Sequence, residues 1–149
     1  MLNFTADILL LLAVQAPGAP GAPAGHWINP RGTVIVEIAP CGGEAICGWV
    51  RWASNKAVAD ARAGGTDPLV GTELFRDFVA KRDGRWKGRL FVPDLARTHS
   101  AELRLMDARR LKVSGCMAGR LLCKSQVWTR TDPPDGSGAT LPTVRGAAQ

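Results

Sequence analysis

Four cysteines and two histidines are the side chains of this 149-residue chain with the widest chemical range. The cysteines fall into two pairs along the sequence, Cys41 with Cys47 and Cys116 with Cys123, spaced as C-x5-C and C-x6-C. A zinc knuckle places two thiolates on one metal with the tighter spacing C-x2-C or C-x4-C. The spacing therefore favours disulfide bonds over a metal site.

Residues that would support catalysis are sparse. His26 lies within Gly25-His26-Trp27, and His99 follows a predicted turn; the chain has no GxSxG elbow, HExxH helix or Gly-rich phosphate loop. Asp94, His99 and Ser100 would supply the groups of a hydrolytic cluster. An Asp at a turn more often caps its own backbone, and a His on a strand more often replaces an aromatic residue. We therefore expect no catalytic residue, cofactor or metal, and an envelope-acting hydrolase is the alternative.

Positive charge is spread along the chain. Nineteen basic and 13 acidic residues give a formal net charge of +6, with no long block of one sign. Trp86 is flanked by four basic residues, Arg82, Arg85, Lys87 and Arg89. Small barrels bind single-stranded nucleic acid through such faces, but Asp83 interrupts this run, and alternating basic residues usually face solvent. We expect no nucleic-acid partner, and an anionic lipid or cell-wall polymer suits the charge better.

Antiparallel strands are the elements expected to position these residues. Apolar and polar residues alternate, or β-branched residues cluster, over 33–39, 46–52, 86–92, 101–106, 111–116 and 125–130. Residues 56–63 predict a short helix, and the apolar spacing over 74–79 fits helix and strand equally. Short strands at intervals of about 8 to 12 residues, without an α/β repeat, predict a single all-β domain, a sandwich or barrel.

The N-terminus has the pattern of a signal peptide. Ile8–Val14 is an apolar run too short to span a hydrocarbon core of about 30 Å, and small residues follow it. Small-x-small sites lie at Val14-Gln15-Ala16 and Ala22-Pro23-Ala24, and we prefer the second because the first leaves Pro17 at the new N-terminus. The sequence thus predicts a signal peptide over 1–24, a domain over 25–130 and a disordered tail over 131–149. The mature protein is expected in the periplasm or outside the cell, without a transmembrane helix.

Five short motifs follow one another over residues 25–130: Gly25-His26-Trp27, Pro40-Cys41-Gly42, Cys47-Gly48-Trp49-Val50, Trp86-Lys87-Gly88 running to Pro93-Asp94, and Gly115-Cys116 with Cys123 to Arg130. In this order and spacing they resemble the Domain of Unknown Function 2147 family of exported bacterial proteins. The family pattern also has an Asn-Pro-Asp segment and an Asp-Gly-Lys-x-Tyr turn. Here these are degenerate, at residues 66–68 and 94–99, and the chain has no Tyr.

This resemblance implies a small antiparallel β-barrel, similar to those of the calycins and lipocalins, and brings no known reaction. Calycins typically carry Gly-x-Trp on the first strand and a basic residue near the end of the last strand. Gly25-x-Trp27 and Arg130 fit this pattern. Trp27 is expected to plug one end of the barrel, with the flat guanidinium of Arg130 over its indole ring.

The expected barrel leaves the disulfide connectivity and the ligand open. Each cysteine pair flanks a predicted hairpin turn, which favours Cys41 with Cys47 and Cys116 with Cys123, whereas neighbouring first and last strands keep Cys41 with Cys123 as an alternative. Candidates for a ligand pocket, or for the core, are Trp49, Trp52, Trp86 and Trp128. Glycines that permit close approach of a ligand are Gly48, Gly88 and Gly115. We expect a non-enzymatic protein that binds a small apolar or amphipathic molecule or an envelope partner, and a structural module with a filled barrel is the alternative.

Overall fold

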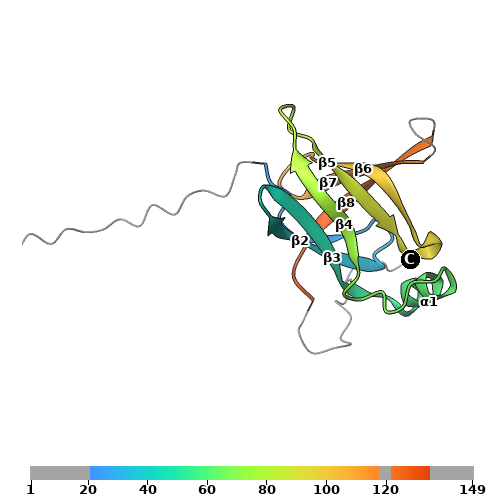
Figure 1. Ribbon diagram of the computed structural model, residues 1–149. Helices are drawn as coiled ribbons and strands as arrows, with labels where there is room; N and C mark the ends of the chain where they lie inside the picture. The colour runs from blue at the N-terminus through green and yellow to red at the C-terminus, as the bar shows by residue number, and fades with distance from the viewer. Residues whose placement is uncertain (1–20, 118–121, 135–149) are drawn as a thin grey trace, which may run out of the picture.

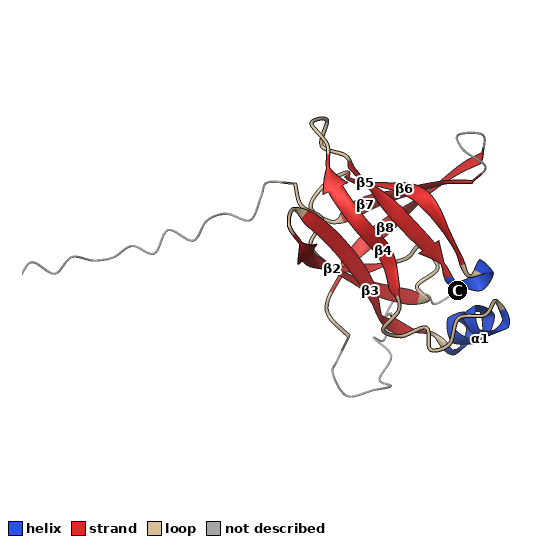
Figure 2. Ribbon diagram, in the orientation of Figure 1, coloured by secondary structure: helices blue, strands red, loops and turns tan. Residues whose placement is uncertain are grey.

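Eight antiparallel strands form a closed barrel in the computed structural model, which describes residues 21–117 and 122–134 (Figures 1 and 2). They are β1 (Gly25–Ile28), β2 (Val34–Gly42), β3 (Ala45–Ala53), β4 (Glu73–Ala80), β5 (Trp86–Val92), β6 (Arg97–Leu105), β7 (Arg110–Met117) and β8 (Leu122–Thr131). Each strand pairs with the next along the chain, and β1 also pairs with β8, where Trp27 lies opposite Arg130. This last pairing leaves no unpaired edge between the described strands.

The connections alternate between two ends of the barrel. At the entry end, where the chain enters β1, lie the turns β2–β3, β4–β5 and β6–β7. At the opposite end, here called the helix end, α1 (Asn55–Ala63) joins β3 to β4, and the 3-10 helix η1 (Pro93–Leu95) joins β5 to β6. The Ser54 side chain caps α1 by accepting a hydrogen bond of 3.1 Å from the backbone N–H of Ala57. Thr66, which follows α1, donates 2.9 Å to the carbonyl of Pro93, so the two helices form one covering layer.

A β-bulge in β4 explains the apolar spacing that fits a helix. The register with β5 shifts between Arg76 and Val79, and Asp77 has a φ of 53°. The bulge interrupts the usual alternation of side chains, so Phe75 and Phe78 both point into the core and are fully buried. The segment is therefore a strand.

Aromatic rings fill the middle of the barrel. Phe75 packs edge-on against Phe78 and Trp128, with ring centroids 5.9 and 5.5 Å apart. Gly48 and Gly88 lie directly under these rings. A Cβ added at Gly48 would lie 2.6 Å from the ring of Phe75, and one at Gly88 would lie 2.7 Å from the ring of Phe78. These two glycines therefore make room for the protein's own core.

The ends of the domain differ from the predicted boundaries. The chain packs against the barrel from Gly21 onward, before the expected start at Gly25, and Thr131 belongs to β8. Residues 1–20 of the expected signal peptide, and the expected tail from residue 135, lie outside the described residues. Within the described part of the chain, neither helix has the length and hydropathy needed to cross a membrane.

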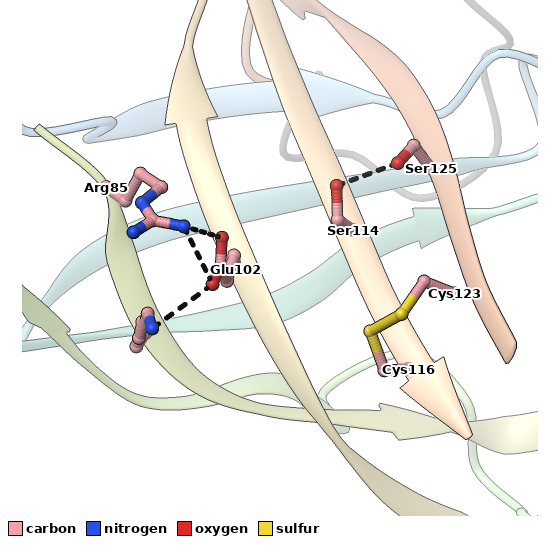
Figure 3. The surroundings of a disulfide bond; sticks show 7 residues. Arg85, Glu102, Ser114, Cys116, Cys123 and Ser125 are labelled. Carbon is pink, nitrogen blue, oxygen red and sulfur yellow. Dashed lines mark hydrogen bonds and ion pairs between the residues drawn. A yellow bond between two sulfur atoms is a disulfide. The ribbon is translucent and has the colours of Figure 1, made fainter. Parts of the chain in front are cut away.

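Both disulfide bonds close hairpins, with the favoured connectivity. Cys41 is bonded to Cys47 across β2–β3, and Cys116 to Cys123 across β7–β8. The alternative pairing of Cys41 with Cys123 is wrong, and neither pair offers thiolates to a metal. Figure 3 shows the second disulfide on the same outer face as the hydroxyl pair of Ser114 and Ser125, whose oxygens are 2.9 Å apart.

The outer face of β5 and β6 carries a small ionic network. Glu102 accepts from Arg85 at 3.2 Å and pairs with Lys87 at 3.4 Å (Figure 3). In the preceding turn the side chain of Arg85 donates 2.6 Å to Asp83, and its backbone N–H donates 3.2 Å to the same carboxylate. These hydrogen bonds hold the pKa of Asp83 at about 2, below its ordinary value of 3.8.

The Asp83 carboxyl is expected to titrate near pH 2. Because this pKa is lowered by folding, the Asp83–Arg85 interaction favours the folded state at full strength above about pH 4, and this contribution is lost as the pH falls toward 2. In an Arg85→Ala variant the midpoint should return toward 3.8. Carboxyl-carbon NMR across an acid titration measures both values. An unchanged midpoint in the variant would show that Arg85 does not cause the shift.

Removing the β7–β8 disulfide is expected to lower the free energy of unfolding by about 2 to 3 kcal/mol, because the bond closes a short loop in the unfolded chain. Urea unfolding of the Cys116→Ser/Cys123→Ser variant measures the loss. Ser114→Ala/Ser125→Ala, which removes the neighbouring hydroxyl pair from the same face, is the control and should lose about 1 kcal/mol or less. Equal stability of the cysteine variant and the native protein contradicts the prediction.

Candidate functional site

Trp27 closes the entry end of the barrel. Its ring is fully buried, and the guanidinium carbon of Arg130 lies 4.3 Å from the ring centroid. Arg130 also donates from Nε to the carbonyl of Ala108 at 2.7 Å and from Nη1 to that of Ala24 at 2.8 Å. The planar guanidinium thus joins β8, the β6–β7 turn and the incoming chain around one indole ring, in the arrangement expected from Gly25-x-Trp27 and a basic residue on the last strand.

The incoming chain also covers this end. The Pro23 carbonyl accepts a 2.9 Å hydrogen bond from Trp27 Nε1, and the Gly21 carbonyl accepts one of 3.2 Å from Trp86 Nε1. Trp27 lies on β1 and Trp86 on β5, which stand on opposite sides of an eight-stranded barrel. Residues 21–24 therefore cross the entry end, and ligand access from this side is blocked.

A shallow, open depression of about 490 Å³ lies beside the β6–β7 turn on the outside of the entry end. It is lined by Asp107, Ala108, Arg109, Arg110 and Thr129. The backbone N–H of Arg109 and the side chain of Arg110 lower the pKa of Asp107, so this carboxylate is already satisfied by its own turn. The depression contains none of the site residues that the sequence predicts.

The helix end is covered only in part. Ala61 of α1 and Leu69, in the segment that follows it, belong to the buried core, and Phe91 of β5 is partly buried against that core. Figure 2 shows the β7–β8 hairpin and α1 on opposite sides of this end, well apart from one another. The covering layer of α1 and η1 therefore lies over the β3–β6 side. It leaves the inner face of β7 and β8 uncovered toward their connecting turn, beyond the buried Val113 and Trp128.

Strand alternation identifies the residues of this uncovered inner face. Ala101 and Leu103 of β6 are in the core, so His99 points to the same side; Trp128 of β8 is in the core, and its alternate neighbours follow it. We call the following set the mouth surface: His99, Gly115, Met117, Leu122, Lys124 and Gln126. Met117 and Leu122 lie directly opposite each other and are 38% and 64% exposed. They form an apolar pair on the inner face of the hairpin.

His99 gives the mouth surface an unsatisfied polar atom. The ring is half-buried, its Nε2 is shielded from solvent, and no described residue hydrogen-bonds to that atom. An orphaned buried nitrogen costs about 1 to 3 kcal/mol, which a folded protein seldom tolerates without a reason. Lys124 adds a positive charge on the same inner face, and among the described residues it has no ion-pair partner. Gly115 lies opposite Lys124, and a Cβ added there would be in ordinary van der Waals contact with Leu90 Cδ2, at 3.6 Å.

The four candidate tryptophans do not line one pocket. Trp86 and Trp128 belong to the core, Trp52 is half-buried on β3, and Trp49 faces outward with the Arg51 guanidinium carbon 5.8 Å from its ring centroid. Of the four, Trp128 adjoins the mouth surface, because its Nε1 donates 3.2 Å to the side-chain oxygen of Gln126.

The residues considered for a hydrolytic cluster are separated. His99 and Ser100 are successive residues of β6, so His99 faces the interior and Ser100 the outside. Asp94 lies in η1. A nucleophile and a base on opposite faces of one strand cannot share a proton, so this set does not form a catalytic site.

The sequence alone predicts strands that start at Ala101 and Ser125, whereas β6 begins at Arg97 and β8 at Leu122. The predicted strands therefore leave out most of the mouth surface. The signal was present in the alternation from His99 to Leu103, which extends the strand pattern back to His99. On β8 the inner face carries the polar residues Lys124 and Gln126, so apolar and polar residues do not alternate there.

Comparison with known proteins identifies the family. The model of the family described as "Uncharacterized protein conserved in bacteria (DUF2147)" matches residues 25–130. No curated protein matches the chain. Protein HP1028 from the human pathogen Helicobacter pylori, which its title assigns to the lipocalin family, has a similar structure, with a TM-score of 0.56 and 10% sequence identity over 73% of this chain and 82% of that one. At this identity the likeness shows the fold alone, a lipocalin-like barrel. Because the family model spans nearly the whole barrel, this chain belongs to the DUF2147 family of bacterial proteins.

Proposed function

We propose that this protein is an exported, non-enzymatic binding protein that holds a small amphipathic molecule against the mouth surface. The observation that carries the proposal is the pairing of exposed apolar side chains with an unsatisfied buried nitrogen on one inner face of a lipocalin-like barrel. Elsewhere in the described part of the barrel, the inner faces of the strands are packed against aromatic rings or covered by α1 and η1.

The apolar part of the ligand would contact Met117 and Leu122. Removing a Met or Leu side chain from water contributes about 1.5 to 3 kcal/mol when burial is complete. Partial coverage of the two side chains therefore stays below the roughly 8 kcal/mol that micromolar binding requires, and the polar contacts of the ligand must supply the rest. Leu90, which lies opposite His99 on β5, extends the apolar surface toward the core. Recognition of this part is by shape, as in other concave apolar sites.

The polar part of the ligand would meet His99 and Lys124. Nε2 of His99 can donate or accept one hydrogen bond, and Lys124 supplies a positive charge. A carboxylate or hydroxyl group suits both residues, because it satisfies the orphaned nitrogen and accepts from the ammonium. We therefore propose an amphipathic acid or alcohol as the ligand class.

Export is supported by the two disulfide bonds. Such bonds persist in oxidising compartments such as the bacterial periplasm, and they are rare in the reducing cytosol. With the family being bacterial, the proposed location is the periplasm or the medium.

A purely structural role is the second candidate. It is favoured by the filled middle of the barrel, where Gly48 and Gly88 leave room only for the rings of Phe75 and Phe78. The ligand proposal therefore concerns the helix end alone, and the experiment below separates the two roles.

Adding a side chain at Gly115 is expected to block binding. A Cβ there meets nothing closer than Leu90 Cδ2 at 3.6 Å, so Gly115→Leu adds an apolar side chain to the mouth surface without a backbone clash at Cβ. Titration of the native protein with palmitic acid, a quinone and an isoprenoid alcohol should give a saturable change in tryptophan emission with at least one of them. The Gly115→Leu variant should bind that probe about tenfold more weakly, which corresponds to about 1.4 kcal/mol.

Ser114→Leu is the matched control, because it adds the same side chain to the outer face of the same strand and should leave the affinity unchanged. No saturable change with any probe would retire the ligand-binding role in favour of the structural one. Equal weakening by both variants would place the binding site elsewhere.

Replacing His99 is expected to raise the free energy of unfolding and to weaken binding of an acidic ligand. His99→Leu removes an unsatisfied buried nitrogen, so the free energy of unfolding should rise by about 1 kcal/mol in urea titrations. The affinity for a fatty acid should fall, whereas that for its methyl ester should stay near the native value. His26→Leu on β1 is the control and should change neither affinity. A destabilised His99→Leu protein with native affinity for the acid would contradict the assignment of His99 to the ligand's polar group.

A further inference from the structure

Residues 21–24 are bound to the barrel by three backbone carbonyls. Gly21 accepts from Trp86 Nε1 at 3.2 Å, Pro23 from Trp27 Nε1 at 2.9 Å, and Ala24 from Arg130 Nη1 at 2.8 Å. Pro23 is among the fully buried residues, and Ala22 packs against the core. These four residues therefore form part of the folded domain, although they precede the first strand.

Cleavage of the chain after Ala24 would damage the closed end. It would remove all three acceptors, which leaves the indole N–H groups of Trp27 and Trp86 unsatisfied in a buried place. It would also create an ammonium group at Gly25, beside the guanidinium of Arg130. A Cβ added at Gly25 would lie 2.5 Å from Arg130 Nη1, so the guanidinium lies close against Gly25. Two positive charges this close repel each other.

We infer that the leader is removed upstream of Gly21, and that residues 21–24 stay on the mature protein as the plug of the entry end. This inference rests on the export that forms part of the proposed function. The step is hydrolysis of one peptide bond, in which one water molecule yields a carboxylate on the leader and an ammonium group on the mature chain. Two small-x-small triplets lie in this window. Val14-Gln15-Ala16 leaves the disfavoured Pro17 as the first residue, whereas Ala16-Pro17-Gly18 leaves Ala19.

The mature N-terminus can be read directly. The full chain, expressed in a Gram-negative bacterium, is recovered from the periplasm, and its intact mass and N-terminal sequence are determined. A first residue between Pro17 and Gly21 is the expected result. A first residue at Gly25 overturns the inference while leaving export intact. An uncleaved chain in the cytosol overturns both export and processing, and it leaves the ligand titration as a separate test of the binding role.

The role of the plug is tested on three purified chains that begin at residues 17, 21 and 25. The first two should melt at the same temperature, because they retain all three carbonyls, and the third should melt about 10 °C or more lower. Equal melting of all three overturns the inference, whereas failure of the third chain to fold supports it.

The Trp86→Phe substitution gives a second test, which applies when the chain from residue 25 folds. It removes the indole N–H that donates to Gly21, so it should lower the melting temperature of the chain from residue 21 more than that of the chain from residue 25. Equal losses in the two chains would show that the contact with Gly21 contributes nothing.

Discussion

The closure of β1 against β8 is the constraint on which the rest of the structure depends. β1 is only four residues long, so its pairing with β8 supplies few backbone hydrogen bonds. Arg130 compensates by covering Trp27 and binding the carbonyls of Ala24 and Ala108, which belong to two other segments. A short strand that closes a barrel needs such side-chain support, because an unpaired edge would otherwise be exposed to other chains.

The two halves of the barrel are packed differently. From Trp27 to the rings over Gly48 and Gly88, the interior is packed in the manner of an ordinary protein core. Toward the helix end the packing stops on one side, because α1 and η1 cover the β3–β6 wall and not the β7–β8 hairpin. The disulfide between Cys116 and Cys123 cross-links that hairpin on its outer face, and neither α1 nor η1 covers its inner face.

The strand order, the disulfide pairs and the closing contact of Trp27 with Arg130 could be anticipated from local patterns and from the family resemblance. Each depends on residues close in the sequence or on a motif of known geometry. The bulge at Asp77 could not, because an extra residue in a strand leaves an apolar spacing that is also typical of a helix. The outward position of Trp49 depends on strand register, and the orphaned nitrogen of His99 on contacts between several strands, neither of which is visible in one segment.

The separation of the packed core from the mouth surface has a consequence for how such a protein can change over evolutionary time. Substitutions at Met117, Leu122 or Lys124 alter the exposed inner face of a hairpin whose register is held by a covalent cross-link, and they touch none of the rings that stabilise the barrel. On this hairpin, residues proposed to contact the ligand lie outside the buried core cluster, whereas His99 belongs to the proposed site and also affects stability. A lineage can vary the exposed residues of this one hairpin while the fold is inherited intact.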